Sequence, residues 1–207
     1  MQTDMYYDTV IAGCGVAGLY AALKLPASSN ILMICKESME ECDSMLAQGG
    51  ICVLHDEDDY AAYFEDTMRA GHYENNTESV DIMIRQSRPV IEELLRLGVR
   101  FEENADGSLR YTREGGHSRP RICFHKDITG KEITTVLQKH VRECPNITVW
   151  QHTKMTDLLV ERGSCRGSVV ESASQQLINI HAVDTILATG GIGGLYEHST
   201  NYPSLTG

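Results

Sequence analysis

The segment from Tyr7 to Gly18 constrains the fold more than any other part of the chain. It reads as an apolar strand that turns directly into a run of helix-forming residues. In such a turn Gly13 permits the sharp bend, Gly15 lets a pyrophosphate approach the backbone, and Gly18 lets helix and strand pack closely. A helix that begins near Val16 directs its unpaired N–H groups and the positive end of its dipole at the phosphates. The segment therefore predicts a dinucleotide-binding turn, with an ordinary strand–helix turn as the alternative.

The end of the next predicted strand, residues 31–35, bears on which dinucleotide is bound. An NAD-binding fold usually places an acid there, about 20 residues beyond the glycines, to bind a ribose hydroxyl. Lys36 occupies that place and Glu37 follows one residue later. A cation suits a phosphate or the adenosine edge better than a ribose diol, so the pattern weakens the NAD interpretation. The alternative is a solvated lysine at a strand end.

Charge and hydropathy exclude several classes of partner. The 207 residues have a formal net charge of −11, which disfavours nucleic acid and anionic membrane surfaces. No apolar stretch approaches the roughly 20 residues that span a bilayer. Asp4 and Asp8 flank the first strand, unlike the start of a secretory leader. We therefore expect no nucleic-acid or membrane partner and a cytoplasmic location.

The cysteines indicate reduced thiols. Their number is odd and no Cys-x-x-Cys pair occurs, so neither a disulfide framework nor a zinc site is predicted. The spacing of Cys35, Cys42 and Cys52 fits no iron–sulfur pattern, and no metal is expected. The seven cysteines are Cys14, Cys35, Cys42, Cys52, Cys123, Cys144 and Cys165.

Helical periodicity appears in three further places. Residues 58–70 and 129–143 each predict one helix. A third helical segment begins near Val80, and Pro89 is expected to divide it into two pieces. Thr77 or Ser79 is its expected N-cap.

Strand patterns fill most of the remainder, and Asp106-Gly107 is a strong hairpin signal. A short antiparallel meander is expected ahead of a buried strand that enters a glycine run. The meander consists of the predicted strands 155–160, 167–172 and 177–181, and the buried strand is 182–188. The other predicted strands are 99–101, 109–111 and 147–150. Strands that alternate with helices predict an α/β fold of Rossmann-like type, a parallel sheet with helices and an inserted antiparallel β-meander. No linker composition indicates a domain boundary.

Four segments in this order resemble the succinate dehydrogenase and fumarate reductase flavoprotein superfamily, and within it the L-aspartate oxidase subfamily. Together they are far more specific than any one motif, and the resemblance runs from Tyr7 to Gly207. The segments are Gly13–Gly18, Ala47-Gln48-Gly49-Gly50, Thr112–Arg119 and Ala188-Thr189-Gly190-Gly191.

Two positions separate the subfamilies. Respiratory members have a histidine five residues before the motif glutamine, where FAD is attached covalently, and this chain has Asp43 there. The resemblance therefore implies noncovalent FAD. Respiratory members also have a phenylalanine before the paired glycines of the substrate loop, where this chain has Glu114. A carboxylate can receive the ammonium of an amino acid, which a plain diacid lacks.

The resemblance implies a set of FAD-binding residues. The first turn would contact the pyrophosphate, Lys36 would lie near the adenosine end, and residues 43–50 would wrap the flavin ring and ribityl arm. The backbone at 155–156 would meet the adenine, and 189–190 would close over the pyrophosphate. The full set is Gly13, Cys14, Gly15, Val16, Ala17, Gly18, Lys36, Asp43, Ser44, Met45, Leu46, Ala47, Gln48, Gly49, Gly50, Met155, Thr156, Thr189 and Gly190.

The reaction that the resemblance implies is FAD-dependent oxidation of L-aspartate to iminoaspartate, the first step of de novo NAD biosynthesis. Glu114 would be the catalytic residue, recognising the ammonium. Oxygen or fumarate would accept the electrons, and iminoaspartate would be handed to quinolinate synthase. An exposed loop glutamate is the alternative for Glu114. His117, Arg119, Arg121 and His125 are candidate carboxylate binders, with structural hydrogen bonding as the default and a His125–Asp127 pair as one form of it.

The resemblance also implies that residues 1–207 are the N-terminal part of an FAD-binding domain, with the capping and C-terminal helical domains absent and turnover impaired. Two other functions stay open: a succinate or fumarate oxidoreductase flavoprotein, and a noncatalytic flavin-binding fragment. An NAD-dependent dehydrogenase ranks last because the later motifs have no role in it.

Overall fold

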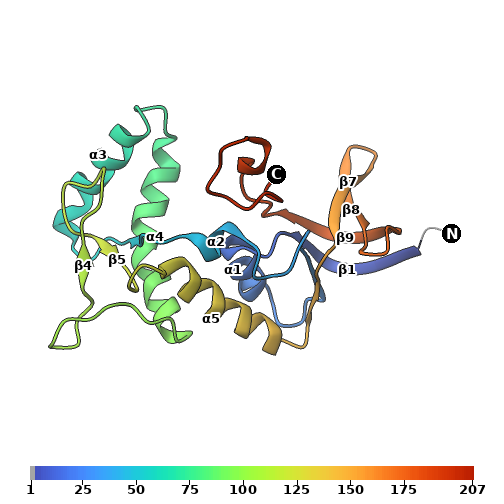
Figure 1. Ribbon diagram of the computed structural model, residues 1–207, viewed down its shortest axis with the longest axis horizontal. Helices are drawn as coiled ribbons and strands as arrows, with labels where there is room; N and C mark the ends of the chain where they lie inside the picture. Colours follow the sequence, from blue (N-terminus) through green and yellow to red (C-terminus); the bar gives the residue numbers. More distant parts are fainter. Residues whose placement is uncertain (1–2) are drawn as a thin grey trace. The chain divides into compact units, whose positions relative to one another are not determined.

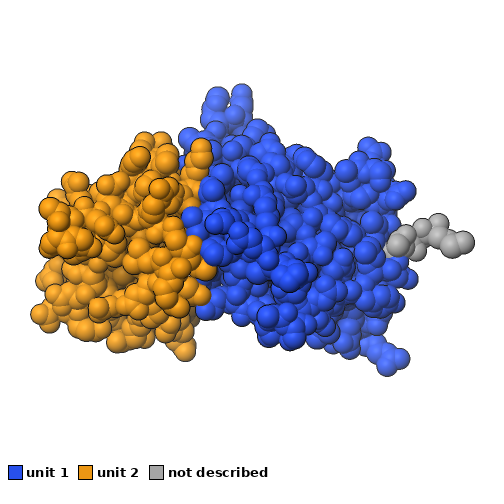
Figure 2. Space-filling model, turned by 90° about the horizontal axis from the view of Figure 1, so that it is seen from below, with its two compact units in different colours: residues 1–46, 134–207 blue, residues 47–133 orange. Residues whose placement is uncertain are grey.

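The computed structural model describes residues 3–207, which fall into two compact units coloured separately in Figure 2. Unit 1 comprises the chain through Leu46 together with Thr134–Gly207, and unit 2 comprises Ala47–Ile133. No composition shift marks these boundaries, which is why no boundary is predicted from the sequence. Unit 2 is instead recognised by its own buried core and its own small sheet.

Unit 1 is an α/β layer structure built on a six-stranded sheet (Figure 1). Helix α5 (Thr129–Glu143) contains the last residues of unit 2 and the first of the second stretch of unit 1. The other elements are β1 (Thr3–Ala12), α1 (Val16–Lys24), β2 (Ile31–Ile34), α2 (Asp43–Leu46), β6 (Ile147–Trp150), β7 (Lys154–Glu161), β8 (Ser164–Glu171), β9 (Leu177–Leu187) and the 3₁₀ turn η2 (Gly193–Leu195).

The sheet has the order β6-β2-β1-β9-β8-β7. Strands β6, β2, β1 and β9 run parallel, with Ala12 opposite both Ile34 and Leu187. Strands β7 and β8 continue the sheet in antiparallel fashion beyond β9. The predicted Rossmann-like α/β fold with an antiparallel meander is therefore confirmed.

Strand β2 and the second half of β1 are apolar because both of their faces are covered. All four residues of β2 are buried, and Val10, Ile11 and Ala12 of β1 are at most 4% exposed. Helix α1 packs against these strands through Leu19.

The two strands predicted over 177–181 and 182–188 are one strand, β9. The expectation that its second half is buried is wrong, since Val183 and Leu187 are 74% and 57% exposed. Successive strand residues face opposite sides of a sheet. The side that carries Ile180 and Ala182 packs into the core, and Val183 and Leu187 lie on the other.

Unit 2 has a helical pair and a three-stranded antiparallel sheet of order β3-β5-β4. Its core joins residues of α3 and α4, including Tyr63, Met68, Val80 and Ile84. Its elements are β3 (Ile51–Cys52), the 3₁₀ turn η1 (Glu57–Asp59), α3 (Tyr60–Ala70), α4 (Thr77–Arg96), β4 (Tyr111–Thr112) and β5 (Ile122–Cys123).

Helix α4 is continuous through Pro89, so the predicted division into two pieces is wrong. Proline removes one backbone hydrogen bond, but Ile84 and Ile91 on either side of it are both buried, and this packing favours an unbroken helix. The N-cap is Asn76, whose Oδ1 accepts the N–H of Ser79 at 2.9 Å, rather than Thr77 or Ser79 itself.

The turn around Asp106-Gly107 forms as predicted, with the N–H of Asn104 donating to the carbonyl of Ser108 at 2.8 Å. The flanking strands are shorter than expected, reduced to a bridge between Glu103 and Leu109. Strand β4 pairs instead with β5. Across residues 3–207 no helix combines the length and apolar character that a membrane crossing requires.

Candidate functional site

The first turn admits only glycine at two positions. Gly13 has φ of +116°, and a Cβ on it would lie 2.1 Å from the carbonyl oxygen of Ala188. A Cβ on Gly18 would lie 2.0 Å from the carbonyl oxygen of Gly13. The turn, helix α1 and the end of β9 are therefore in backbone contact, as a pyrophosphate-binding turn requires.

Helix α1 begins as predicted, with Gly15 as its N-cap residue. Gly15 has no side chain to offer, and the N–H of Val16 donates instead to Ser44 Oγ at 3.0 Å. A residue 28 positions away thus caps the helix and fixes α2 beside the turn.

We expect Ser44→Ala to lower the free energy of unfolding by about 1 kcal/mol, because it removes a capping acceptor. Urea unfolding measures this change, with the exposed Ser28→Ala on the same unit as the control. Ser28→Ala should shift stability by less than about 0.5 kcal/mol. Equal effects of the two substitutions would show that Ser44 is not a functional cap.

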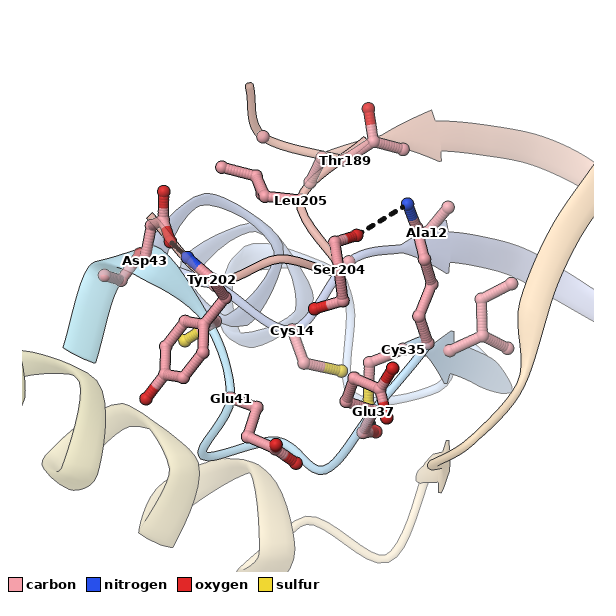
Figure 3. Close-up of a pocket in the computed structure, with 18 of the residues that line it drawn as sticks. Ala12, Cys14, Cys35, Glu37, Glu41, Asp43, Thr189, Tyr202, Ser204 and Leu205 are labelled. Carbon is pink, nitrogen blue, oxygen red and sulfur yellow. Dashed lines mark hydrogen bonds between the residues drawn. The ribbon is translucent and has the colours of Figure 1, made fainter. Parts of the chain in front are cut away.

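A cavity of about 480 Å³ opens at the carboxyl ends of β2, β1 and β9 (Figure 3). This is the edge of a parallel sheet at which α/β proteins bind ligands, and the volume lies within the range of about 300–1,000 Å³ typical of ligand sites. The glycine turn and the N-terminus of α1 form part of its wall.

The structure brings most of the predicted cofactor residues of unit 1 to this cavity. Gly18, Met45, Leu46 and Thr156 do not line it: Gly18 packs against Gly13, and Thr156 Oγ1 donates to the carbonyl of Val169 on β8. Those that line it are Gly13, Cys14, Gly15, Val16, Ala17, Lys36, Asp43, Ser44, Met155, Thr189 and Gly190.

Sequence reasoning missed a group of lining residues near the end of the chain, Tyr202, Ser204 and Leu205. Lys36 Nζ donates to the carbonyl of Ser204 at 3.2 Å, the dashed line in Figure 3, and to Thr206 Oγ1 at 2.6 Å. Only the glycine run that follows β9 could have signalled that the chain turns back here.

Asp43, which stands where covalent family members have histidine, has a structural partner. Its Oδ1 accepts the N–H of Tyr202 at 3.1 Å. The carboxylate therefore ties α2 to the segment that returns to the cavity.

In unit 2 the structure brings together a motif that the resemblance assigned to the flavin ring and the loop that it assigned to the substrate. A Cβ on Gly49 would lie 3.0 Å from Glu114 Oε2, so the Glu114 carboxylate lies directly over this glycine. Both residues are exposed. A Cβ on Gly50 would lie 2.3 Å from the carbonyl oxygen of Cys123, and Gln48 Nε2 donates to Asp127 Oδ2 at 3.1 Å. Residues 48–50 are thus held against the body of unit 2, with an acid above them.

Arg121 is not available as a substrate ligand, because its side chain is fully buried. Its guanidinium donates to both oxygens of Asp59 at 2.7 and 2.8 Å, and to Asp66 Oδ2 at 2.8 Å. The hydrogen bonds that Arg121 donates, chiefly to Asp59 and also to Asp66, raise the pKa of Arg121 above its ordinary value despite burial. The structural interpretation of Arg121 is correct.

The other loop candidates have structural partners as well. His117 Nδ1 lies 3.0 Å from Arg121 Nη1, and its Nε2 lies 3.3 Å from Cys52 Sγ. Because arginine only donates, the His117 proton lies on Nε2. Arg119, half exposed, pairs with Asp59 at 3.6 Å.

Asp127 accepts a hydrogen bond from the Gln48 side chain, and the backbone N–H of His125 donates to Thr129 Oγ1 at 2.9 Å. No group of three or more metal-binding side chains occurs within residues 3–207.

The glycine turn, the N-terminus of α1 and the cavity at the sheet's carboxyl edge define a dinucleotide-binding domain of the Rossmann class. A comparison with known families identifies it further. The FAD binding domain family matches residues 8–207, and the chain belongs to this family. Its cofactor is FAD, which the glycine cradle, the helix N-terminus and Lys36 fit.

The chain is similar to L-aspartate oxidases. It is 43% identical over 200 residues to that of Clostridium perfringens, covering 97% of this chain and 45% of the relative. It is 39% identical to that of Neisseria meningitidis, covering 100% of this chain and 41% of the relative. The chain thus spans less than half the length of these relatives.

Among solved structures, Escherichia coli quinol fumarate reductase superposes with a TM-score of 0.93 at 28% identity, covering 100% of this chain and 36% of that one. A flavocytochrome c3 fumarate reductase superposes with a TM-score of 0.81 at 26% identity, covering 91% of this chain and 34% of that one. The resemblance seen in the motifs is confirmed.

Proposed function

We propose that this chain is the FAD-binding part of an L-aspartate oxidase, which oxidises L-aspartate to iminoaspartate. The observation that supports the proposal most directly is the Glu114 carboxylate over Gly49. The identity of 43% to an L-aspartate oxidase supports it from the side of sequence.

Three residues of this chain, Glu114, Gly49 and Gly50, have a stated role in the proposal. Bound FAD supplies the oxidising group. Glu114 accepts charge-assisted hydrogen bonds from the substrate ammonium, and so orients the carbon that bears it. Because Gly49 has no side chain, that carboxylate can lie close to its backbone, and Gly50 packs against the carbonyl of Cys123, which holds the segment in place.

A succinate or fumarate oxidoreductase is the second candidate, favoured by the close superposition on fumarate reductase. Such diacids have no ammonium, and Glu114 would repel their carboxylates.

In the L-aspartate oxidase proposal FAD is held noncovalently, since Asp43 offers no attachment. The proposal includes oxygen or fumarate as acceptor, transfer of iminoaspartate to quinolinate synthase, and a cytoplasmic location.

Glu114→Gln tests the proposal through binding. We expect L-aspartate to perturb the visible absorbance of the FAD-loaded protein, and Glu114→Gln to weaken its binding about 10–100-fold. The reason is the loss of a charged hydrogen bond worth about 1.5–3 kcal/mol. Glu103→Gln, an exposed glutamate of the same unit, is the matched control and should leave binding unchanged.

Succinate separates the two candidates. We expect it to bind wild type more weakly than L-aspartate does, and to gain affinity in Glu114→Gln. Tighter binding of succinate to wild type would favour the second candidate.

Because the chain covers 45% of the Clostridium perfringens relative, we further propose that capping and C-terminal helical domains complete the enzyme. Full aspartate-dependent peroxide release by the 207 residues alone would refute that part.

A further inference from the structure

Three of the seven cysteines line the dinucleotide cavity, and the proposed function assigns no role to their thiol groups. Cys14 stands between Gly13 and Gly15 in the first turn. Cys35 directly follows β2, and Cys42 precedes α2. All three are free thiols.

Backbone register places Cys14 and Cys35 just beyond the ends of two neighbouring strands, β1 and β2. Ala12 is opposite Ile34 in the parallel β1–β2 pair, and the N–H of Gly13 donates to the carbonyl of Ile34 at 2.8 Å. Neighbouring strands lie about 4.8 Å apart. Continued by one residue, that register sets Gly13 opposite Cys35, and Cys14 is the next residue along the turn. A disulfide requires Cα atoms about 4.4–6.8 Å apart, a range that includes a diagonal neighbour on an adjacent strand.

The two side chains also face each other. Figure 3 shows both sulfur atoms directed to the same point below Ser204, and each thiol is a hydrogen-bond partner of the other. Cys35 Sγ also donates to the carbonyl of Glu37 at 3.2 Å.

Access to the pair is through the cavity. Cys14 is 3% exposed and Cys35 is half-buried, and both belong to the cavity wall. A dinucleotide in the cavity covers this wall. Without one, solvent and small oxidants reach Cys35 first.

We propose that Cys14 and Cys35 are a redox-active dithiol pair, and that formation of their disulfide and binding of FAD oppose each other. A sulfur–sulfur bond of about 2.05 Å draws the Cys14 turn towards the end of β2. The turn has no slack, because the Cβ position of Gly13 already lies 2.1 Å from the Ala188 carbonyl oxygen. Oxidation therefore distorts the pyrophosphate seat.

A hydroperoxide is the oxidant in this reaction. The Cys35 sulfur, as thiolate, attacks the outer peroxide oxygen; the O–O bond breaks, and with hydrogen peroxide the other oxygen leaves as water after taking up a proton. The Cys35 sulfenic acid that results is attacked by the Cys14 sulfur. The S–S bond forms, the S–O bond breaks, and hydroxide leaves with the Cys14 proton as a second water. Two thiols are oxidised and one hydrogen peroxide is reduced to two waters.

The environment of Cys14 suits its role as the thiol that attacks the Cys35 sulfenic acid. Its hydrogen bond with Cys35, followed by burial, raises the pKa of the Cys14 thiol above its ordinary value. Cys14 therefore keeps its proton until the leaving hydroxide can take it.

Mass spectrometry of the FAD-free protein tests the proposal. With stoichiometric hydrogen peroxide we expect a mass loss of two hydrogen atoms and a cross-linked peptide pair containing Cys14 and Cys35. FAD at about 10 times its dissociation constant should slow the cross-link about tenfold, since only FAD-free protein reacts. The oxidised protein should bind FAD more weakly, and dithiothreitol should restore binding.

Controls come from the other thiols. Cys35→Ser should abolish the cross-link, whereas Cys144→Ser and Cys165→Ser, outside the cavity wall, should not. The wild-type peptide map does not depend on any variant folding. A dominant link to Cys42, an absent cross-link, or equal rates with and without FAD would each overturn the proposal.

Discussion

Gly13→Ala should abolish FAD binding at micromolar concentrations. The substitution places a Cβ 2.1 Å from the Ala188 carbonyl oxygen at a residue with φ of +116°. The backbone conformation costs about 1–2 kcal/mol, and forcing a methyl group into a packed contact costs about 1–3 kcal/mol more. Relief requires the turn to move away from β9, which removes the pyrophosphate seat. Fluorescence quenching of FAD measures affinity, and urea unfolding measures stability.

Two other glycines separate the causes of this effect. Gly18→Ala introduces a backbone contact of 2.0 Å without a positive φ. Gly163→Ala introduces a positive φ of +79° in open space. We expect Gly18→Ala to impair FAD binding and Gly163→Ala to leave it intact with a stability loss of about 1 kcal/mol. Normal FAD affinity in Gly13→Ala would contradict the proposed role of the first turn.

These glycines also show why the first turn could be predicted from sequence. Its determinants lie within the contiguous segment Gly13–Gly18, so strand, turn and helix are all specified locally. The same holds for the turn at Asp106-Gly107. Where a structure depends on local chain geometry, the residues alone indicate it.

Features that depend on distant packing could not be predicted in this way. Helix α4 passes through Pro89 because Ile84 and Ile91 are both buried, which no local rule reveals. Strand β9 appeared as two strands because only one side of it is covered. Arg121 looked like a loop cation, yet Asp59 and Asp66, more than 50 residues away, bury it.

The candidate site divides in the same way. The glycine turn and Lys36 followed from local pattern. The family resemblance assigned Glu114 and Gly49 to one site, but their contact, across 65 residues of sequence, was not predicted and comes from the structure. Neither the local pattern nor the family resemblance predicted that Ser204 and Leu205 line the cavity, because their position depends on how the chain returns after β9.

Asp66→Asn should cost about 3–5 kcal/mol of stability, the usual effect of removing one partner from a buried ion pair. Asp66 is 3% exposed, and it accepts bonds from Arg121, Arg69 and both the N–H and Oγ of Ser118. Substitution leaves the fully buried Arg121 with Asp59 as its remaining carboxylate. Urea unfolding at pH 7 measures the loss.

An exposed pair gives the control for this prediction. Arg88 and Glu92, both 61% exposed, lie one helical turn apart, and Glu92→Gln should cost no more than about 0.5 kcal/mol. If Asp66→Asn costs as little, the buried network does not stabilise the unit.

The pH dependence of stability should show the contribution of the buried Asp66–Arg121 network. Burial alone would raise the pKa of Asp66, but hydrogen bonds from Ser118 and Arg121 outweigh it and hold the pKa well below its usual range. A carboxylate with a lowered folded pKa adds stability above its unfolded pKa of about 3.9, and loses it as pH falls towards the folded value. The stability difference between wild type and Asp66→Asn should therefore be constant near neutral pH and shrink below about pH 4. Because Asp66 holds Ser118, four residues after Glu114, the variant should also expose the loop to proteolysis.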